Sequence, residues 1–433
     1  MIGRPVTYHR LSQDEVDNIC QRHANLLQGR MNGARASFAY KVIEGLDLSG
    51  RNLTDADFSG AVLAGANLAG TNFTSANLFA ADLRRSNLAG ATLRRADMRG
   101  AILRGANLTG ADMSEADLRE GAIAQVDREK GLAIITHEQR PHEAVEANFT
   151  GANLTNSKMT GAIAQRADFS DAILIGARLN RANLRGSRFP GANLEGADLS
   201  GADLTEADLT HTVLIGTRMD NARTRGMRTD GALTDAPTGP EIAADADETA
   251  RALEAHARWC ETGGAEGAPS TFDGADMRGL KTLAGRNLTA IQARGATLYG
   301  LDLDGAQLQG ARLERADLRM ASLRGADLRG ADLTGARLNN ADLRGAKIGA
   351  LLLPGDRKLA ANLAAAVLRY ADLEGADLRD LNATGADFSY ASLANCDVRR
   401  ARFNGSCFTG TRLPQGFRKL VEDVSGAVDL DAA

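Results

Sequence analysis

The chain has 433 residues, including 47 glycines, only 4% aromatic residues, and a formal net charge of −4 at pH 7. This near balance argues against a general affinity for nucleic acid and against a strongly acidic surface. The four cysteines, Cys20, Cys260, Cys396 and Cys407, are scattered and form no CxxC pair, which excludes a disulfide framework or a zinc ribbon. Without an apolar signal region or a run of 18 apolar residues, we expect a cytoplasmic protein that does not insert into a membrane.

Residues 1–45 are predicted to form an N-terminal helical cap. Ser12-Gln-Asp-Glu15 is a capping-box pattern, and it precedes apolar and small residues at helical spacing. Asn32-Gly33 is a turn signal that ends the helix.

From LDLSG (46–50) to GAIAQ (121–125) the sequence repeats every five residues. Most blocks start with Ala and continue with Asp or Asn, and each has Leu or another apolar residue at its centre. A period of five gives neither an apolar stripe on a helix nor one apolar face on a flat strand. It suits a chain that extends for about three residues and then turns at a glycine corner. Such coils bury their apolar residues only by stacking, which predicts a solenoid with 46–125 as its first part.

The central residues of the blocks are predicted to fill the column. In the first part they are Leu48, Leu53, Phe58, Leu63, Leu68 and Phe73. In a later part they are Leu318, Leu323, Leu328, Leu333 and Leu343.

Residues 126–146 lack the pattern, and we expect an inserted loop or hairpin in which GLAIIT (131–136) could be a strand. The segment HEQRPHE carries His137, Glu138, Arg140 and His142. Its two histidines are five residues apart with a proline between them, so they do not match the zinc spacing of a metalloprotease helix. We interpret these four residues as a solvated loop and as candidate contacts for a partner.

Blocks resume over 147–235, and residues 236–271 are predicted to be a linker with an internal capping helix. Residues 14–34 align with 247–268, and both segments lead into GRNLT, at 50–54 and 285–289. This similarity indicates an internal duplication.

The second solenoid is predicted over 272–414, with a bulge or kink at LLLPGDRKLA (351–360). Residues 415–433 form the C-terminal tail, in which we expect a short helix.

Two helical pairs, Cys20 with His23 and His256 with Cys260, have ligand-like spacing. Two ligands do not complete a zinc site, although four from two helices would. We favour packing of the helices onto the first coils and expect no metal and no cofactor. A regular array of carboxylates without a cavity is not a catalytic pair, so we do not expect an enzyme.

Blocks such as ADLSG (197–201), ANLTG (106–110) and ADLRG (326–330) resemble the A(D/N)LXX signature of pentapeptide-repeat proteins. The resemblance implies an all-β solenoid, a right-handed quadrilateral β-helix with four blocks per coil. Together with the duplication, it predicts two tandem solenoids, each with an N-terminal capping helix.

Residues 20 apart would then stack on one face, which predicts four arginine ladders. The pairs are Arg84 with Arg104, Arg99 with Arg119, Arg324 with Arg344, and Arg379 with Arg399. Residues 272–414 carry 20 Lys and Arg against 16 Asp and Glu, so these faces could bind an acidic partner.

Two functions remain open from the sequence. A rigid solenoid with irregular insertions is suited to be a non-catalytic scaffold or adaptor that binds another protein. The family resemblance implies an alternative, because some members mimic B-DNA and protect type II topoisomerases such as gyrase. That role calls for a strongly acidic, rod-shaped dimer, which the charge here does not favour. Direct nucleic-acid binding is not expected, and a homodimer is left open.

Overall fold

The structure is a computed structural model that describes most of the chain. The described residues are 9–119, 123–127, 131–135, 144–240, 242, 247–280 and 282–430, of which 123–127, 131–135 and 247–248 are described by their backbone alone. The chain divides into two compact units, Met1–Asp235 and Ala236–Ala433.

Each unit is a stack of coils held by parallel backbone pairing between residues one coil apart. Asn67 pairs with Asn87, and Asn87 pairs with Asn107. Leu68 donates its N–H to the Asn87 carbonyl (2.7 Å), and Asn87 donates to the Ala66 carbonyl (3.0 Å). The same spacing of 20 residues recurs along both units, so four five-residue blocks complete one coil of a parallel β-helix.

The chain turns at the fifth position of each block with a positive φ. Gly65 has φ 66°, as expected for a residue without a Cβ. Arg85 occupies the next coil at the same corner with φ 55°. A non-glycine residue in this region is strained, and the coils above and below hold it there.

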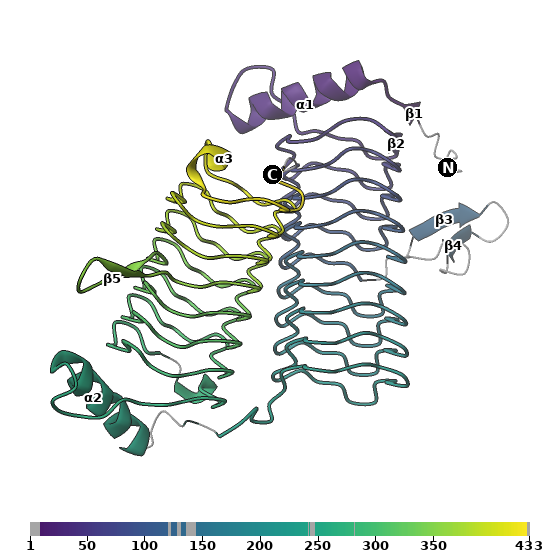
Figure 1. Ribbon diagram of the computed structural model, residues 1–433. Helices are drawn as coiled ribbons and strands as arrows, with labels where there is room; N and C mark the ends of the chain where they lie inside the picture. The colour runs from purple at the N-terminus through teal and green to yellow at the C-terminus, as the bar shows by residue number, and fades with distance from the viewer. Residues whose placement is uncertain are drawn as a thin grey trace. The chain divides into compact units, whose positions relative to one another are not determined.

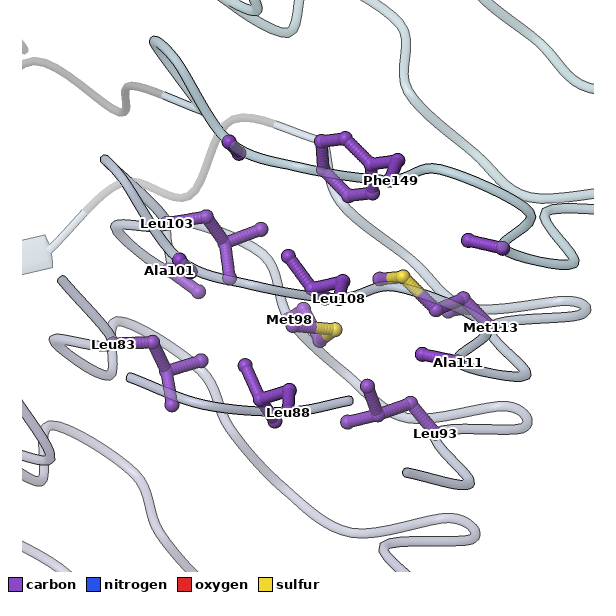
Figure 2. Packing of buried hydrophobic residues seen from close by; sticks show 14 of the residues in the cluster. Leu83, Leu88, Leu93, Met98, Ala101, Leu103, Leu108, Ala111, Met113 and Phe149 are labelled. Carbon is purple, nitrogen blue, oxygen red and sulfur yellow. The ribbon is translucent and has the colours of Figure 1, made fainter. Parts of the chain in front are cut away.

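The interior of each unit is a column of leucine and alanine. Leu83, Leu88 and Leu93 of one coil lie beside Leu103 and Leu108 of the next (Figure 2). All eleven residues expected at the centre of the column are buried, each 1% exposed or less. The alternation of inward Ala and Leu with outward Asp or Asn produces this column, because residues two apart in an extended segment face the same side.

A helix lies near the start of each unit. Helix α1, Gln13–Leu27, crosses the end of the unit 1 coils (Figure 1). Ser12 forms the capping box with Glu15, as the sequence predicts. Helix α2 spans Asp247–Glu261 and buries Leu253 in the core of unit 2. In the part of the chain that the structure describes, the short helices are η2, Arg278–Leu280, and α3, Phe417–Leu420.

Three two-stranded sheets accompany the coils among the described residues. Strand β1 (His9–Arg10) pairs in parallel with β2 (Lys41–Val42). The antiparallel pairs are β3 (Ile123–Asp127) with β4 (Gly131–Ile135), and β5 (Leu351–Leu353) with β6 (Arg357–Leu359).

The expected bulge at 351–360 is therefore a hairpin. Asp332 pairs with Asn362 instead of with residue 352, so the hairpin adds ten residues without disturbing the register of the column.

Three block boundaries from the sequence need correction. The column of unit 1 begins near Ala36, because Ser37 already pairs with Asp57. The column of unit 2 continues beyond residue 414, because Arg402 pairs with Asp423 and Cys407 with Val428. These segments lack the A(D/N)L signature, but the wall requires only a small or apolar residue facing inward.

The third correction concerns GAIAQ (121–125), which the sequence predicts to be the last regular block before the insertion. Its residues Ile123–Gln125 instead belong to β3 and pair with β4. Ala144 takes the place in the wall and donates its N–H to the Ile163 carbonyl (2.8 Å). The two strands contain the β-branched residues Ile123, Val126, Ile134 and Ile135, which favour strand pairing.

Candidate protein-interaction surface

Most of the predicted ladder arginines belong to a local structure formed by the triplet Asp–Leu–Arg or its Asp–Met–Arg and Asp–Val–Arg variants. In ADLRD (376–380), Arg379 Nε donates to Asp377 Oδ1 (2.8 Å) and Nη2 donates to Oδ2 (2.6 Å). The backbone N–H of Arg379 also donates to Asp377 Oδ1 (3.2 Å). Six of the eight predicted arginines make this bidentate contact: Arg84, Arg99, Arg119, Arg344, Arg379 and Arg399.

These contacts neutralise both charges at the surface. Hydrogen bonding from Arg379 lowers the pKa of Asp377, and Arg344 and Arg399 lower the pKa values of Asp342 and Asp397 in the same way. The ladders predicted from the sequence therefore have the expected positions, but most of their positive charge is already paired. Whether they bind a partner stays a prediction.

Arg104 and Arg324 differ from the other six because their blocks have no acid at the second position. Ile102 and Ser322 stand where the other blocks have Asp. Arg324 forms an ion pair with an aspartate of the next coil, with its Nε 3.9 Å from Asp342 Oδ2. The exposed Arg104 side chain makes no ion pair or side-chain hydrogen bond with the described residues. The residue two positions before each arginine therefore distinguishes the paired arginines from Arg104 and Arg324, and it can be read from the sequence.

Arg104 lines a surface hollow of about 450 Å³ together with Arg84 and Arg85. Among the described residues, the one acid in its lining is Glu44, which is ion-paired with Arg10 at 2.9 Å. Arg85, at a corner of the coil, was not predicted from the sequence, and its side chain also has no acidic partner among the described residues. We call Arg84, Arg85 and Arg104 the basic hollow.

A second hollow, which Arg99 lines, has a different charge. Its lining contains Arg95, Arg99 and Lys158 against three acids, Asp97, Glu115 and Asp117. The balanced charge of this hollow shows that the excess of unpaired cations in the basic hollow is not a general property of the wall.

The inserted segment returns to the wall next to the basic hollow. Gly105, which directly follows Arg104, donates its N–H to the Val145 carbonyl (3.1 Å). Hairpin β3–β4 projects outward from unit 1 (Figure 1). The predicted contact residues His137, Glu138, Arg140 and His142 lie outside the described residues.

The two cysteine–histidine pairs pack the helices onto the coils. His23 Nδ1 accepts the backbone N–H of Ala36 (3.2 Å), and Cys20 is buried. His256 uses both ring nitrogens on backbone groups, with Ser270 N–H at 2.9 Å and the Thr289 carbonyl at 3.1 Å. In the described part of the chain, no three potential metal ligands come together.

The described helices also include none that is long and apolar enough to cross a membrane.

Comparison with known proteins agrees with the five-residue architecture. The family model described as pentapeptide repeats matches the chain in eight copies, which together cover more than half of it. The matched residues are 44–78, 81–119, 147–186, 187–223, 282–319, 311–348, 360–392 and 384–415. No curated protein matches the sequence.

Three solved structures illustrate the similarity. A pentapeptide repeat protein of the Arabidopsis thaliana thylakoid lumen is 28% identical, over 27% of this chain and 64% of that chain, with a TM-score of 0.19. The plasmid-mediated fluoroquinolone resistance protein QnrB1 is 21% identical over 47% and 86%, with a TM-score of 0.22. HetL, involved in heterocyst differentiation regulation in the cyanobacterium Nostoc sp., is 22% identical over 94% and 93%, with a TM-score of 0.17.

Proposed function

Since the chain belongs to the pentapeptide repeat family, we propose that it is a non-catalytic scaffold that binds another protein through the outward wall of its coils. The basic hollow of unit 1 is the proposed contact, and the partner is a protein surface that presents carboxylates.

The charge of the wall supports this choice. Elsewhere on the wall, Asp–Leu–Arg triplets hold arginines in contact with their own acids, as Arg379 is with Asp377. A partner would have to replace such a contact before it could use the arginine. Arg85 and Arg104 carry no such contact with the described residues, so their guanidinium groups are available for bidentate bonds to a partner's carboxylates.

The coils around the basic hollow also support its assignment as the contact for a partner. The wall beneath Arg104 is fixed by backbone bonds to both neighbouring coils, which include Asn107 N–H to the Ser86 carbonyl and Leu108 N–H to the Asn148 carbonyl. Binding to a wall already fixed in this way costs little conformational entropy on the scaffold side. The inserted segment rejoins the wall at the same place, and irregular segments on rigid frames commonly carry contacts.

Mimicry of DNA toward a type II topoisomerase is the alternative. DNA mimicry would need rows of free carboxylates. In this chain Asp342, Asp377 and Asp397 each accept hydrogen bonds from an arginine guanidinium and from a backbone N–H. We therefore rank the scaffold function above it.

Affinity capture with the full chain tests the proposal. We would compare the parent chain with the double variant Arg85→Glu, Arg104→Glu, at low and at moderate salt. One protein should bind the parent in stoichiometric amount, bind less at the higher salt, and be lost from the double variant, because the proposed contact is ionic.

The matched control is Arg315→Glu, Arg324→Glu in unit 2. Arg315 occupies a corner with φ 59°, as Arg85 does with φ 55°, and Arg324 occupies the same block position as Arg104. This control should retain the partner. Equal loss from both double variants would mean that charge alone drives binding and would reject the hollow, and enrichment of a topoisomerase would favour the alternative.

A further inference from the structure

The two helices that start the units are fastened by the same histidine contact. In α1, His23 is buried and its Nδ1 accepts the N–H of Ala36, 13 residues later. In α2, His256 is buried and its Nδ1 accepts the N–H of Ser270, 14 residues later. Thus each helix is tied by its histidine to the segment that leads from the helix into the coils.

This geometry requires a neutral ring with its proton on Nε2. A nitrogen that accepts a hydrogen bond carries no proton, so Nδ1 must be bare in both histidines. In His256 the Nε2–H donates to the Thr289 carbonyl at 3.1 Å. Protonation of Nδ1 would place two N–H groups against each other in a buried site, which loses the bond and leaves a charge inside.

We infer that His23 and His256 are acid-sensitive latches, which hold α1 and α2 on the ends of their units when neutral and release them when protonated. The inference does not depend on the identity of any partner.

The surroundings of His23 contain little that would stabilise a charged ring. Burial lowers its pKa, and Arg35 acts in the same direction, whereas the Thr54 carbonyl and Asp55 oppose the shift. Asp17 of this helix already forms an ion pair with Arg51, with Oδ1 and Nη2 2.7 Å apart.

The surroundings of His256 are similar. Burial again lowers the pKa, opposed by the Thr289 carbonyl. The centroid of the His256 ring lies 5.8 Å from that of the Trp259 ring. The Cys260 thiol donates a hydrogen bond to the same Thr289 carbonyl. The charged residues Glu254, Arg258 and Glu261 of α2 are exposed, as is Arg286 of the coil beneath.

Release of α1 would uncover an unpaired edge of the β-helix. The Gln13 side chain accepts the N–H of Asp47 (2.9 Å) and donates to its carbonyl (2.8 Å), so it substitutes for a neighbouring strand. Val16 and Cys20 would leave the column together with this side chain. Opening therefore exposes both apolar surface and backbone groups that can pair with another chain.

The sign of the pH effect follows from the lowered pKa. An open helix binds a proton with the ordinary histidine pKa of about 6.5, and the closed helix does so only at lower pH. Opening is therefore unaffected above about pH 6.5. Below it, the opening constant of each helix rises up to ~10-fold per pH unit until the closed-state pKa is reached.

Hydrogen–deuterium exchange of the full chain between pH 7.5 and 5.0 tests the latches, with rates corrected for intrinsic exchange. The amides of α1 and α2 should both lose protection below pH 6.5. His23→Asn keeps an acceptor near the Nδ1 position but cannot titrate, so it should remove the pH dependence of α1 alone. His256→Asn should remove the pH dependence of α2 alone. His9 is exposed, so the control His9→Asn should leave the pH dependence of both helices unchanged.

Nitrogen-15 spectra of the parent imidazoles provide a second measurement that does not require the variants to fold. Both rings should carry the proton on Nε2 at pH 7 and remain neutral at pH 6.0. A proton on Nδ1, normal titration near pH 6.5, or pH dependence that persists in both asparagine variants would overturn the inference.

Discussion

An aspartate and an arginine two positions apart in one block hold each other on the surface, while the leucine between them points into the column. Arg379 and Asp377 share two side-chain bonds, and Leu378 is fully buried. The inward residue supplies hydrophobic stabilisation, and the outward pair contributes little because it is solvent-exposed.

At this scale the sequence predicted the inward residues well and the outward charges poorly. Alternation alone decides that Leu328 faces inward, because residues in an extended segment alternate between faces. Pairing of Arg324 with Asp342 depends on which side chains stand on the neighbouring coil, which requires the register between coils. The freedom of Arg85 likewise could not be read from its own block.

Leu328→Asp should destabilise unit 2 by roughly 3–5 kcal/mol, because it places an unpaired charge in the column. Leu328 is fully buried, whereas Leu352 in hairpin β5–β6 is 70% exposed. Urea unfolding should thus separate Leu328→Asp from the control Leu352→Asp, which should unfold close to the parent. If both variants unfold like the parent, the inward assignment is wrong.

Asp380 should make the stability of unit 2 depend on pH in the acid range. Its bidentate bond to Arg400 (2.7 and 2.8 Å) is the main reason that its pKa falls from 3.8 to about 2. The contribution of Asp380 to the free energy of unfolding is complete above about pH 4 and is lost as the pH falls toward 2. The reason is that, as the pH falls, Asp380 is protonated in the unfolded chain at a higher pH than in the folded chain. Urea titrations should show the parent losing its advantage over Asp380→Asn in that window, and an advantage that is constant down to pH 2 would contradict this.

Among the elements, the hairpins and helices are additions to a wall that keeps its own register. Asn107 pairs with Asn148, so the insertion in unit 1 adds 21 residues, and hairpin β5–β6 adds ten. The sequence predicted an inserted loop or hairpin for the first segment and only a bulge or kink for the second. It misplaced the first boundary because GAIAQ resembles a wall block, whereas Ile123–Asp127 forms a strand that pairs with β4.

Deletion of 126–146 should leave the fold intact and remove the partner. It brings residue 148 to the regular spacing from Asn107, so the coil can close. The circular dichroism and the melting temperature should stay close to those of the parent. The matched control is deletion of 351–360, which also preserves register and should keep the partner. Unfolding after the first deletion would show that the insertion is structural.

For the whole molecule, each of the two units has a hydrophobic core of its own. The core of unit 1 runs from Leu11 to Leu214 and that of unit 2 from Leu253 to Phe417, with no shared residue. The duplication predicted from the sequence agrees with the equivalent roles of His23 and His256. It could not reveal the faces of the wall that carry unpaired charge.

Residues 1–235, produced alone, should fold and unfold cooperatively, because their core needs no residue from unit 2. Circular dichroism and urea unfolding of this fragment would check the prediction. A fragment without strand signal, or without a cooperative transition, would mean that the two units depend on each other.

The central claim is that the basic hollow binds a partner protein, and a photo-crosslinking residue at position 104 in cells of the source organism tests it most directly. The account predicts one dominant protein adduct at position 104 and none at position 324, where the equivalent arginine already has an acid beside it. Absence of an adduct at 104, or the same adducts at both positions, would contradict the claim.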